Sequence, residues 1–294
     1  MAARMNDFLR VGDAPRPSAS QELGRRIRDA FLSELIAGPG TMAREAEKLK
    51  VDVSLQGADI DALHIDASGL VIHLRGAEVD DDDETAEVER REPAVARRAT
   101  FAALPLRFQD VPLDIEATAV NVPIEWLELD DGGLAVGMPE EMTTRSRRAV
   151  RLQLSVAVNP DDVVEAIMRF LRADLAEVDS VHIDREKFTL KQLGPRRFRI
   201  GLSARVRWKF LGPTLRARTE LRIDNRFVVR LLRTKIASSN PLLAVVLRVF
   251  RRRITQDLKK PIDLNQHLRP LVLRRLHIDA GPTRVRVESE AGLI

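Results

Sequence analysis

Cysteine is absent from the 294-residue chain, which excludes disulfide bonds and thiolate metal ligands. Tyrosine is absent as well, and aromatic residues make up only 4% of the sequence. No run of about 18 apolar residues could form a transmembrane helix, and the first residues lack the apolar core of a signal peptide. These absences predict a cytoplasmic protein, for which the inner membrane leaflet is accessible to peripheral contact.

The motifs of common catalytic and cofactor sites are missing too. The sequence has no Gly-x-Ser-x-Gly elbow, no His-Glu-x-x-His zinc motif and no glycine-rich loop with the spacing that cradles phosphates. His64, His182 and His277 occupy equivalent places in short, similar strand patterns, where each is expected to face solvent. We therefore predict no catalytic residue, no metal site and no cofactor, and we expect a protein that is not an enzyme.

Charge is divided unequally along the chain. Residues 1–144 contain 15 Lys/Arg against 29 Asp/Glu, a net −14, whereas residues 145–294 contain 33 against 15, a net +18. A basic half attracts phosphate on nucleic acids or on anionic membranes. The alternative is that the two halves only neutralise each other on a solvated surface. Residues 78–92, with five consecutive acids at 80–84, are too polar to pack and predict a mobile acidic loop.

Local patterns divide the chain into a tail and two halves. Residues 1–17 lack an apolar period and predict a flexible tail. Residues 18–146 predict a helix at about 20–37 and then antiparallel strands, among them a hairpin of residues 63–66 and 70–74. Residues 147–294 predict a second helix with further strands, and we expect the two halves to form one continuous unit. Those further strands are expected at about 180–192, 196–209, 215–223, 227–236, 271–278 and 283–288.

Residues 240–260 combine an apolar helical stripe with a cluster of cations. The stripe follows i, i+3, i+4 spacing, so it forms one face of a helix. Such a face covers its own sheet, a bound lipid or a membrane interface, and an ordinary filled core is the alternative. We predict that an apolar ligand would be lined by residues of this stripe and of nearby strands: Leu243, Val246, Leu247, Phe250, Trp208, Phe210 and Leu231. The cations predicted to meet anionic headgroups are Arg251, Arg252, Arg253, Lys259 and Lys260.

Basic residues also alternate along the strands predicted between 196 and 223. Alternation with a period of two places them on one face of a sheet, where they could follow a phosphate backbone. Nucleic acid is the less favoured partner because single-strand readers need aromatic stacking platforms, which are scarce here. The basic residues concerned are Arg196, Arg197, Arg199, Arg205, Arg207, Lys209, Arg216, Arg218 and Arg222.

The order of patterns in the second half resembles an actinobacterial family that includes the lipomannan elongation factor. The resemblance lies in a turn at Asp224-Asn225, a strand through 227–236, the apolar helix 241–250, a Pro261-Ile-Asp-Leu connection and a closing hairpin at 276–288. The strands from 51 to 76 are similar to the opening of that family. The family is related to tubular lipid-binding (TULIP) domains. The resemblance implies an α+β fold in which a long curved antiparallel sheet wraps around one or two amphipathic helices and shelters acyl chains.

Our leading hypothesis is therefore the non-enzymatic binding of a lipid or another apolar small molecule in a groove between sheet and helix. Peripheral attachment to an anionic membrane would accompany it. The alternative is a basic-surface scaffold or nucleic-acid-binding module. The sequence does not indicate an oligomeric state or the identity of the ligand.

Overall fold

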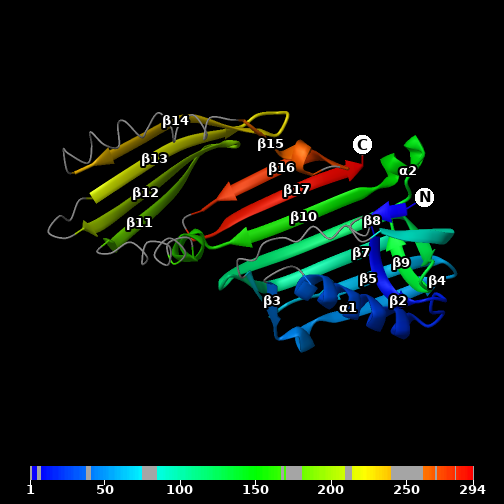
Figure 1. The fold of residues 1–294 in the computed structure, drawn as a ribbon. Coiled ribbons are helices and arrows are strands. Elements are labelled where there is room, and N and C mark those ends of the chain that lie inside the picture. The colour runs from blue at the N-terminus through cyan, green and yellow to red at the C-terminus, as the bar shows by residue number, and fades with distance from the viewer. Residues whose placement is uncertain are drawn as a thin grey trace. The chain divides into compact units, whose positions relative to one another are not determined.

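The protein is described here by a computed structural model (Figure 1). It describes residues 2–4, 8–37, 41–74, 85–166, 169, 181–208, 214–239, 261–268, 270–281 and 283–293. The chain forms two compact units, Met1–Val156 with Glu290–Ile294, and Ala157–Ser289. This division differs from the expected single unit, and its boundary lies after Val156 instead of residue 146. Below, these parts are called unit 1 and unit 2.

Unit 1 combines a long helix with many strands, as an α+β fold should. The helix α1 spans Ser20–Ala37, the range that its heptad-like apolar spacing predicted. The strands are β1 (Ala2–Arg4), β2 (Phe8–Asp13), β3 (Thr41–Arg44), β4 (Lys50–Gln56), β5 (Asp59–Asp66), β6 (Val71–Leu74), β7 (Thr85–Phe108), β8 (Val111–Leu129), β9 (Gly133–Gly137) and β10 (Arg151–Val158). Two short helical segments complete unit 1, a 3-10 turn at Ala46–Lys48 and α2 at Thr144–Ala149.

The centre of unit 1 is the long antiparallel pair β7 and β8, within the strand order β10-β8-β7-β5-β4. Phe108 pairs with Val111, so only two residues form the turn between these strands. Both of them, Gln109 and Asp110, have positive φ values of 52° and 66°. Positive φ at both central residues is what a two-residue hairpin turn requires, because it matches the twist of the strands.

The strands after β4 contradict one expected hairpin. Residues 63–66 and 70–74 do not pair with each other; β5 and β6 each run parallel to β7, and β4 forms the hairpin with β5. The chain between β5 and β6 does not turn back on itself; it continues along β7 in the same direction. Ala67 N–H donates to the carbonyl of Ala102 at 2.7 Å, and Gly69 N–H, at a positive φ of 82°, donates to the carbonyl of Pro105 at 2.8 Å.

Two segments that were expected to be loose belong to the sheet. In the predicted tail, β1 pairs with β7 and β2 pairs with β9, and Val11 is only 1% exposed. In the predicted acidic loop, residues 85–92 are strand, because β7 already begins at Thr85. Its charges there are balanced across the hairpin: Arg91 contacts Glu125 at 3.1 Å and Glu140 at 2.9 Å. Charge density alone therefore misidentified part of a strand as a loop.

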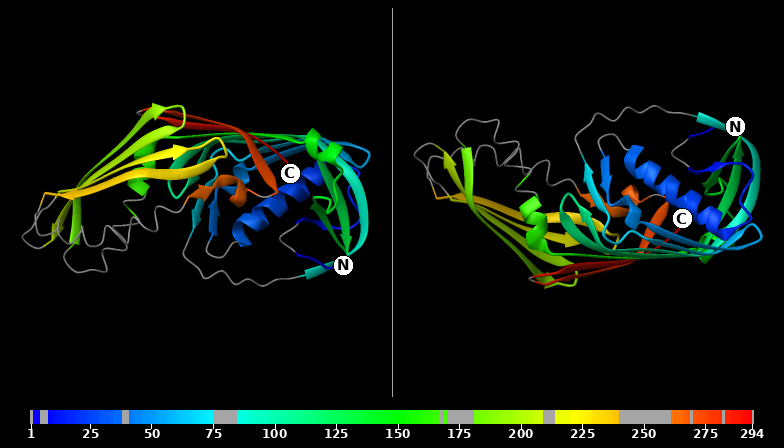
Figure 2. Two further views of the ribbon diagram at one scale, coloured as in Figure 1. Left: turned by 90° about the horizontal axis from the view of Figure 1, so that it is seen from above. Right: turned by 90° about the horizontal axis from the view of Figure 1, so that it is seen from below.

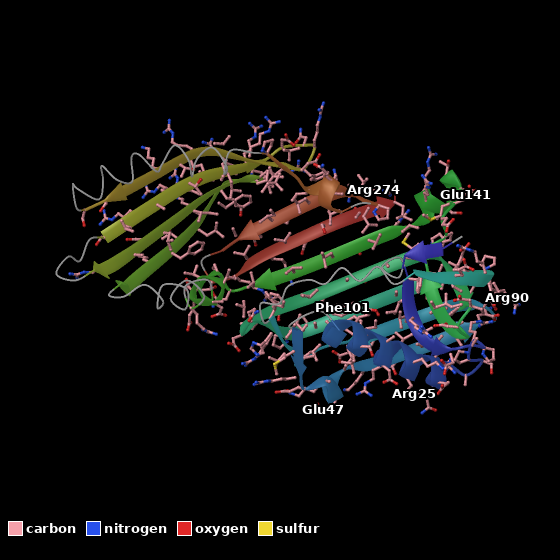
Figure 3. All side chains as sticks on the ribbon, in the orientation of Figure 1. Arg25, Glu47, Arg90, Phe101, Glu141 and Arg274 are labelled. Atoms are coloured by element: carbon pink, nitrogen blue, oxygen red, sulfur yellow. The ribbon has the colours of Figure 1, made fainter. Side chains whose placement is uncertain are left out.

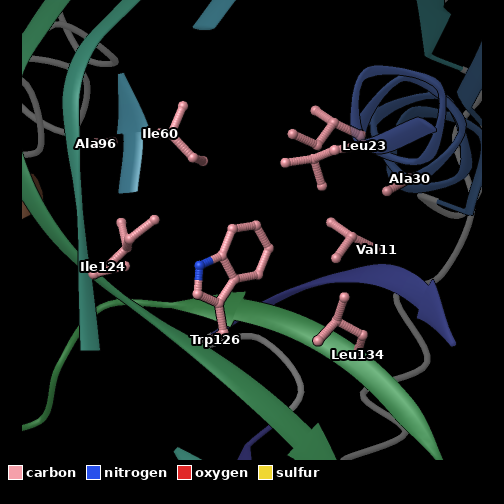
Figure 4. Packing of buried hydrophobic residues seen from close by; sticks show 10 residues of the cluster. Val11, Leu23, Ala30, Ile60, Ala96, Ile124, Trp126 and Leu134 are labelled. Atoms are coloured by element: carbon pink, nitrogen blue, oxygen red, sulfur yellow. The ribbon is translucent and has the colours of Figure 1, made fainter. Parts of the chain in front are cut away.

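The core of unit 1 lies between α1 and the strands, with Trp126 at its centre (Figures 2 and 4). Leu23 of α1 and Leu134 of β9 are fully buried, and Trp126 is 2% exposed. The indole Nε1 of Trp126 donates to the carbonyl of Ala58 at 2.9 Å, so the one polar atom of this large side chain is satisfied. The apolar face of α1 thus stabilises the fold as an ordinary packed core.

Unit 2 contains a five-stranded antiparallel sheet in the order β11-β12-β13-β14-β15. The strands of this sheet are β11 (Val181–Gly194), β12 (Arg197–Trp208), β13 (Thr214–Ile223), β14 (Val228–Ser238) and β15 (Ile262–Asp263). Two later strands, β16 (Leu271–Ala280) and β17 (Val285–Leu293), are not part of it, and β17 ends in unit 1. Residues 160–166 are helical, and α5 is a single turn at Leu264–His267. The strands predicted in this half are confirmed with small shifts at their ends. Among the described helices, none is both long and apolar enough to span a membrane.

Candidate functional site

Most residues of the predicted ligand groove lie outside the described residues. These are Phe210, Leu243, Val246, Leu247 and Phe250, together with the predicted headgroup cations Arg251, Arg252, Arg253, Lys259 and Lys260. For Trp208, the backbone at the end of β12 pairs with Val181, and its side chain is outside the described part. Leu231 lies on β14 and pairs with Leu221. The structure therefore places one predicted groove residue with its surroundings.

The strand register gathers cations on one face of the β11–β14 sheet. Alternate residues of a strand point to the same face, and directly paired residues share it. Arg218, for example, pairs with Gly201 on one side and Lys235 on the other. The basic side chains that share this face are Lys187, Lys191, Arg197, Arg199, Arg205, Arg216, Arg218, Arg222, Arg230, Arg233 and Lys235. We call this the cationic face; it includes six of the basic residues that sequence alternation placed together.

The other face of the same four strands is mainly apolar; its polar residues include Thr219 and Thr234, whose hydroxyls lie 2.9 Å apart. Leu231, Leu221 and Phe198 form one row across three strands, and Phe198 is only 3% exposed. Ile223 is similarly buried, at 6%. The apolar residues that share this face are Phe188, Leu190, Phe198, Ile200, Leu202, Ala204, Leu215, Ala217, Leu221, Ile223, Val229 and Leu231. This set is called the apolar face below. The cationic side chains therefore lie on one face of the sheet, and most of the apolar side chains lie on the other.

Glu220 is the only acid among the described side chains of the cationic face. Its carboxylate accepts hydrogen bonds from Arg197 at 2.8 Å and from Arg199 at 2.7 and 3.0 Å. The hydrogen bond from Arg197, followed by that from Arg199, lowers the pKa of Glu220 from its ordinary 4.5 to about 2. Glu220 therefore stays ionised at any physiological pH and neutralises one end of the face, at Arg197 and Arg199.

Glu220 should also affect the acid stability of the protein. A carboxyl whose pKa is depressed on folding contributes stability above its unfolded value, and that stability is lost as pH falls toward the folded value. The window here runs from pH 4.5 down to about 2. We expect Glu220→Gln to flatten the fall in unfolding free energy across that window, as measured by urea denaturation at a series of pH values. Glu288→Gln serves as control because Glu288 forms only an exposed ion pair, 3.8 Å from Arg286. An unchanged acid limb in Glu220→Gln would show that the pair is not formed in solution.

The centre of the cationic face is hollowed. Two adjacent cross-strand rows, Lys187-Ser203-Arg216-Ala237 and Thr189-Gly201-Arg218-Lys235, place small residues between long ones. The resulting hollow measures about 430 Å³ and is lined by these residues and by Leu202 and Ala217, whose side chains belong to the opposite face and which therefore contribute backbone only. No acid is among its lining residues, whereas the next row contains the neutralising Glu220. The hollow is therefore the part of the face where positive charge is least compensated.

A second hollow, of about 490 Å³, lies between α1 and β2 in unit 1. Its charged groups neutralise one another: Arg25 contacts Glu22 at 2.8 Å and Asp29 at 3.1 Å, and Arg26 contacts Glu22 at 2.9 Å. The bonds from Arg25 and Arg26 hold the pKa of Glu22 at about 2. Arg25 itself projects from α1 at the surface (Figure 3). These contacts are ion pairs between neighbouring turns of α1 at the protein surface. We assign no ligand to this hollow.

The three histidines with equivalent strand patterns, His64, His182 and His277, stand on strands as expected. His64 is exposed on β5 and lies 2.8 Å from the hydroxyl of Thr100, and His277 is exposed on β16. The side chain of His182 is outside the described part. Among the side chains that the structure describes, no group of three or more His, Cys, Asp or Glu is arranged to hold a metal ion.

Sequence reasoning identified the alternating arginines but missed Lys187 and Lys235, which complete the hollow. Those two lysines stand on β11 and β14, on opposite sides of the strands that carry the arginines. The available signal was the strand glycine Gly201, because glycine inside a strand often marks close approach of a ligand. In comparisons with known proteins, no family model, curated protein or solved structure matches this chain.

Proposed function

We propose that the protein is a non-enzymatic lipid-handling protein that attaches to an anionic phospholipid surface through the cationic face of unit 2. The observation that carries this proposal is the separation of cations and apolar side chains onto opposite faces of β11–β14. Basic residues near an anionic leaflet contribute about 1 kcal/mol each, so a face with this many exposed cations can bind without inserting apolar groups.

A membrane is favoured over nucleic acid because of what the cationic face lacks. Among its described side chains there is no aromatic residue, and stacking on aromatic rings is how single strands are held. The cations are spread over four neighbouring strands instead of lying on a helix that could enter a DNA groove. A broad array of this kind suits a surface of headgroup phosphates.

The apolar face supports the second part of the proposal, a site for an apolar ligand. The row of Phe198, Leu221 and Leu231 supplies an aliphatic and aromatic wall of the type that lines lipid sites. In the arrangement that the resemblance to tubular lipid-binding domains implies, an amphipathic helix would cover this wall and acyl chains would lie between them. Native mass spectrometry followed by organic extraction tests this part. A stoichiometric extra mass that extracts as phospholipid supports a carrier, and a bare chain after incubation with lipid contradicts it.

Vesicle co-sedimentation tests the attachment. We expect the protein to pellet with vesicles of phosphatidylcholine and phosphatidylglycerol, to remain in solution with phosphatidylcholine alone, and to be released as salt rises, because salt screens exposed charges. A short DNA duplex is added as competitor. A protein that stays in solution with the vesicles that contain phosphatidylglycerol overturns the proposal. If the duplex releases the protein from anionic vesicles at a phosphate concentration below that of the vesicle lipid, the face is assigned to nucleic acid instead.

A further inference from the structure

The hollow on the cationic face differs from the rest of that face in shape as well as in charge. Gly201 lies in the middle of β12, in ordinary extended backbone, so no special conformation requires a glycine there. The side chain that a Cβ here would meet is Thr189: its Oγ1 would lie 2.5 Å from that Cβ, and the same hydroxyl donates to the carbonyl of Gly201 at 3.4 Å. Glycine weakens a strand interior, and it often marks a place where a ligand approaches closely.

The groups around Gly201 fit one class of ligand. Arg216 and Arg218 stand two residues apart on β13, and their guanidinium groups are suited to bidentate contact with phosphate oxygens. Lys187 and Lys235 add point charges from the flanking strands, and Ser203 adds a hydroxyl donor. The hydroxyl of Thr189 donates to the carbonyl of Gly201 at 3.4 Å. A terminal phosphate carries about −1.5 to −2 charges and three strong acceptor oxygens, so it can engage several such donors together.

We propose that this hollow is a subsite for a terminal phosphate group, with Gly201 as its floor and Arg216, Arg218, Lys187 and Lys235 as its rim. The inference deepens the proposed function and rests on it. It makes the cationic face selective, so that a phospholipid with a monoester headgroup binds in preference to one with a diester headgroup at equal surface charge. Free inorganic phosphate shares the same chemistry and occupies the same hollow.

Two glycine substitutions test the subsite without changing any charge. Gly201→Ala places a methyl group 2.5 Å from Oγ1 of Thr189, so that this side chain must shift within the hollow, whereas Gly194→Ala, at the end of β11, places one where no atom lies within 4 Å. We expect the wild type and Gly194→Ala to bind phosphatidic acid vesicles about tenfold more tightly than phosphatidylglycerol vesicles of matched surface charge, since hydrogen bonds to charged groups are the strong ones. In Gly201→Ala the preference should vanish while binding to phosphatidylglycerol persists. A preference that survives in Gly201→Ala, or is absent from the wild type, overturns the subsite.

A second pair of variants decides the matter even if Gly201→Ala does not fold. Arg218→Gln with Lys235→Gln removes two rim charges, and Arg222→Gln with Arg233→Gln removes two charges of the same face outside the hollow. Only the rim pair should abolish the preference for phosphatidic acid; equal effects of both pairs contradict the proposal.

Inorganic phosphate, followed by amide chemical shifts, separates the subsite from membrane attachment. We expect saturable shifts at Thr189 and Gly201 that the rim pair loses. Phosphate binding without any vesicle binding would overturn the proposed function and leave the subsite standing. Vesicle binding without phosphate-induced shifts, and without a preference for phosphatidic acid, would overturn the subsite and leave the proposed function standing.

Discussion

Neutralising the rim of the hollow is expected to weaken attachment to anionic vesicles by roughly a thousandfold, because each basic residue near such a surface contributes about 1 kcal/mol and about 1.4 kcal/mol is a factor of ten. The variant replaces all four rim cations with glutamine: Lys187, Arg216, Arg218 and Lys235. Exposed side chains on a sheet face contribute little to packing, so the fold should persist. The measurement is the partition coefficient onto phosphatidylcholine vesicles that contain phosphatidylglycerol.

The control removes the same number of charges from unit 1. Its four exposed cations stand on β3, β4 and β7 and are changed to glutamine in the same way: Arg44, Lys50, Arg98 and Arg107. If only net charge governed attachment, the two variants would partition alike. We expect the control to stay within about threefold of the wild type, because the proposed attachment is made by the cationic face and these four residues are not part of it. Similar losses in both variants would mean that no particular face is used.

The salt dependence of these variants carries the same information independently. Attachment by many screened contacts falls steeply with ionic strength, and each cation that is removed makes the fall less steep. The rim variant should therefore show a shallower salt response than the wild type, and the unit 1 control should keep the wild-type response. A rim variant that binds weakly but with an unchanged salt response would indicate damage to the sheet instead of lost electrostatic contact.

The parts of this structure that sequence could predict are those set by local periodicity. Helix α1 follows from apolar residues such as Leu23 and Ile27 at helical spacing, and the cationic face follows from alternation along β12 and β13. Leu231, which was predicted to line an apolar groove, pairs with Leu221 on the face opposite the arginines. In each case one short segment contains the whole signal.

What sequence missed depends on partners that are distant in the chain. The hollow needs four strands in register, so that Lys187 and Lys235 flank the arginines of β13, and no local pattern specifies that register. The parallel pairing of β5 with β7 was missed for the same reason, since turn residues at Ser68 and Gly69 equally suit a hairpin. The flexible tail was predicted because residues 1–17 lack an apolar period, but Val11 of β2 packs into a core that residues far along the chain provide.

Trp126→Ala is expected to cost about 3–5 kcal/mol of unfolding free energy, the largest stability effect that we predict for one substitution. Trp126 is 2% exposed and stands in the cluster that joins α1 to β2, β5, β7, β8 and β9. Removing the indole leaves a cavity among side chains that belong to six elements, and the carbonyl of Ala58 loses its donor. Arg16, whose guanidinium lies 5.6 Å from the ring centroid, loses its cation–π contact as well. Urea denaturation followed by circular dichroism measures the loss.

Two further substitutions separate the contributions of Trp126. Trp126→Phe keeps most of the apolar volume but removes Nε1, so it should cost about 1 kcal/mol, the net value of one partly buried hydrogen bond. Leu154→Ala, at a side chain that is 42% exposed, should stay within about 0.5 kcal/mol of the wild type. The loss of unfolding free energy should therefore be largest in Trp126→Ala, smaller in Trp126→Phe and smallest in Leu154→Ala. A Phe variant as unstable as the Ala variant would mean that the hydrogen bond to Ala58 contributes more stability than the packing of the ring. The turn between β4 and β5, where Ala58 lies, would then depend on that one bond from β8.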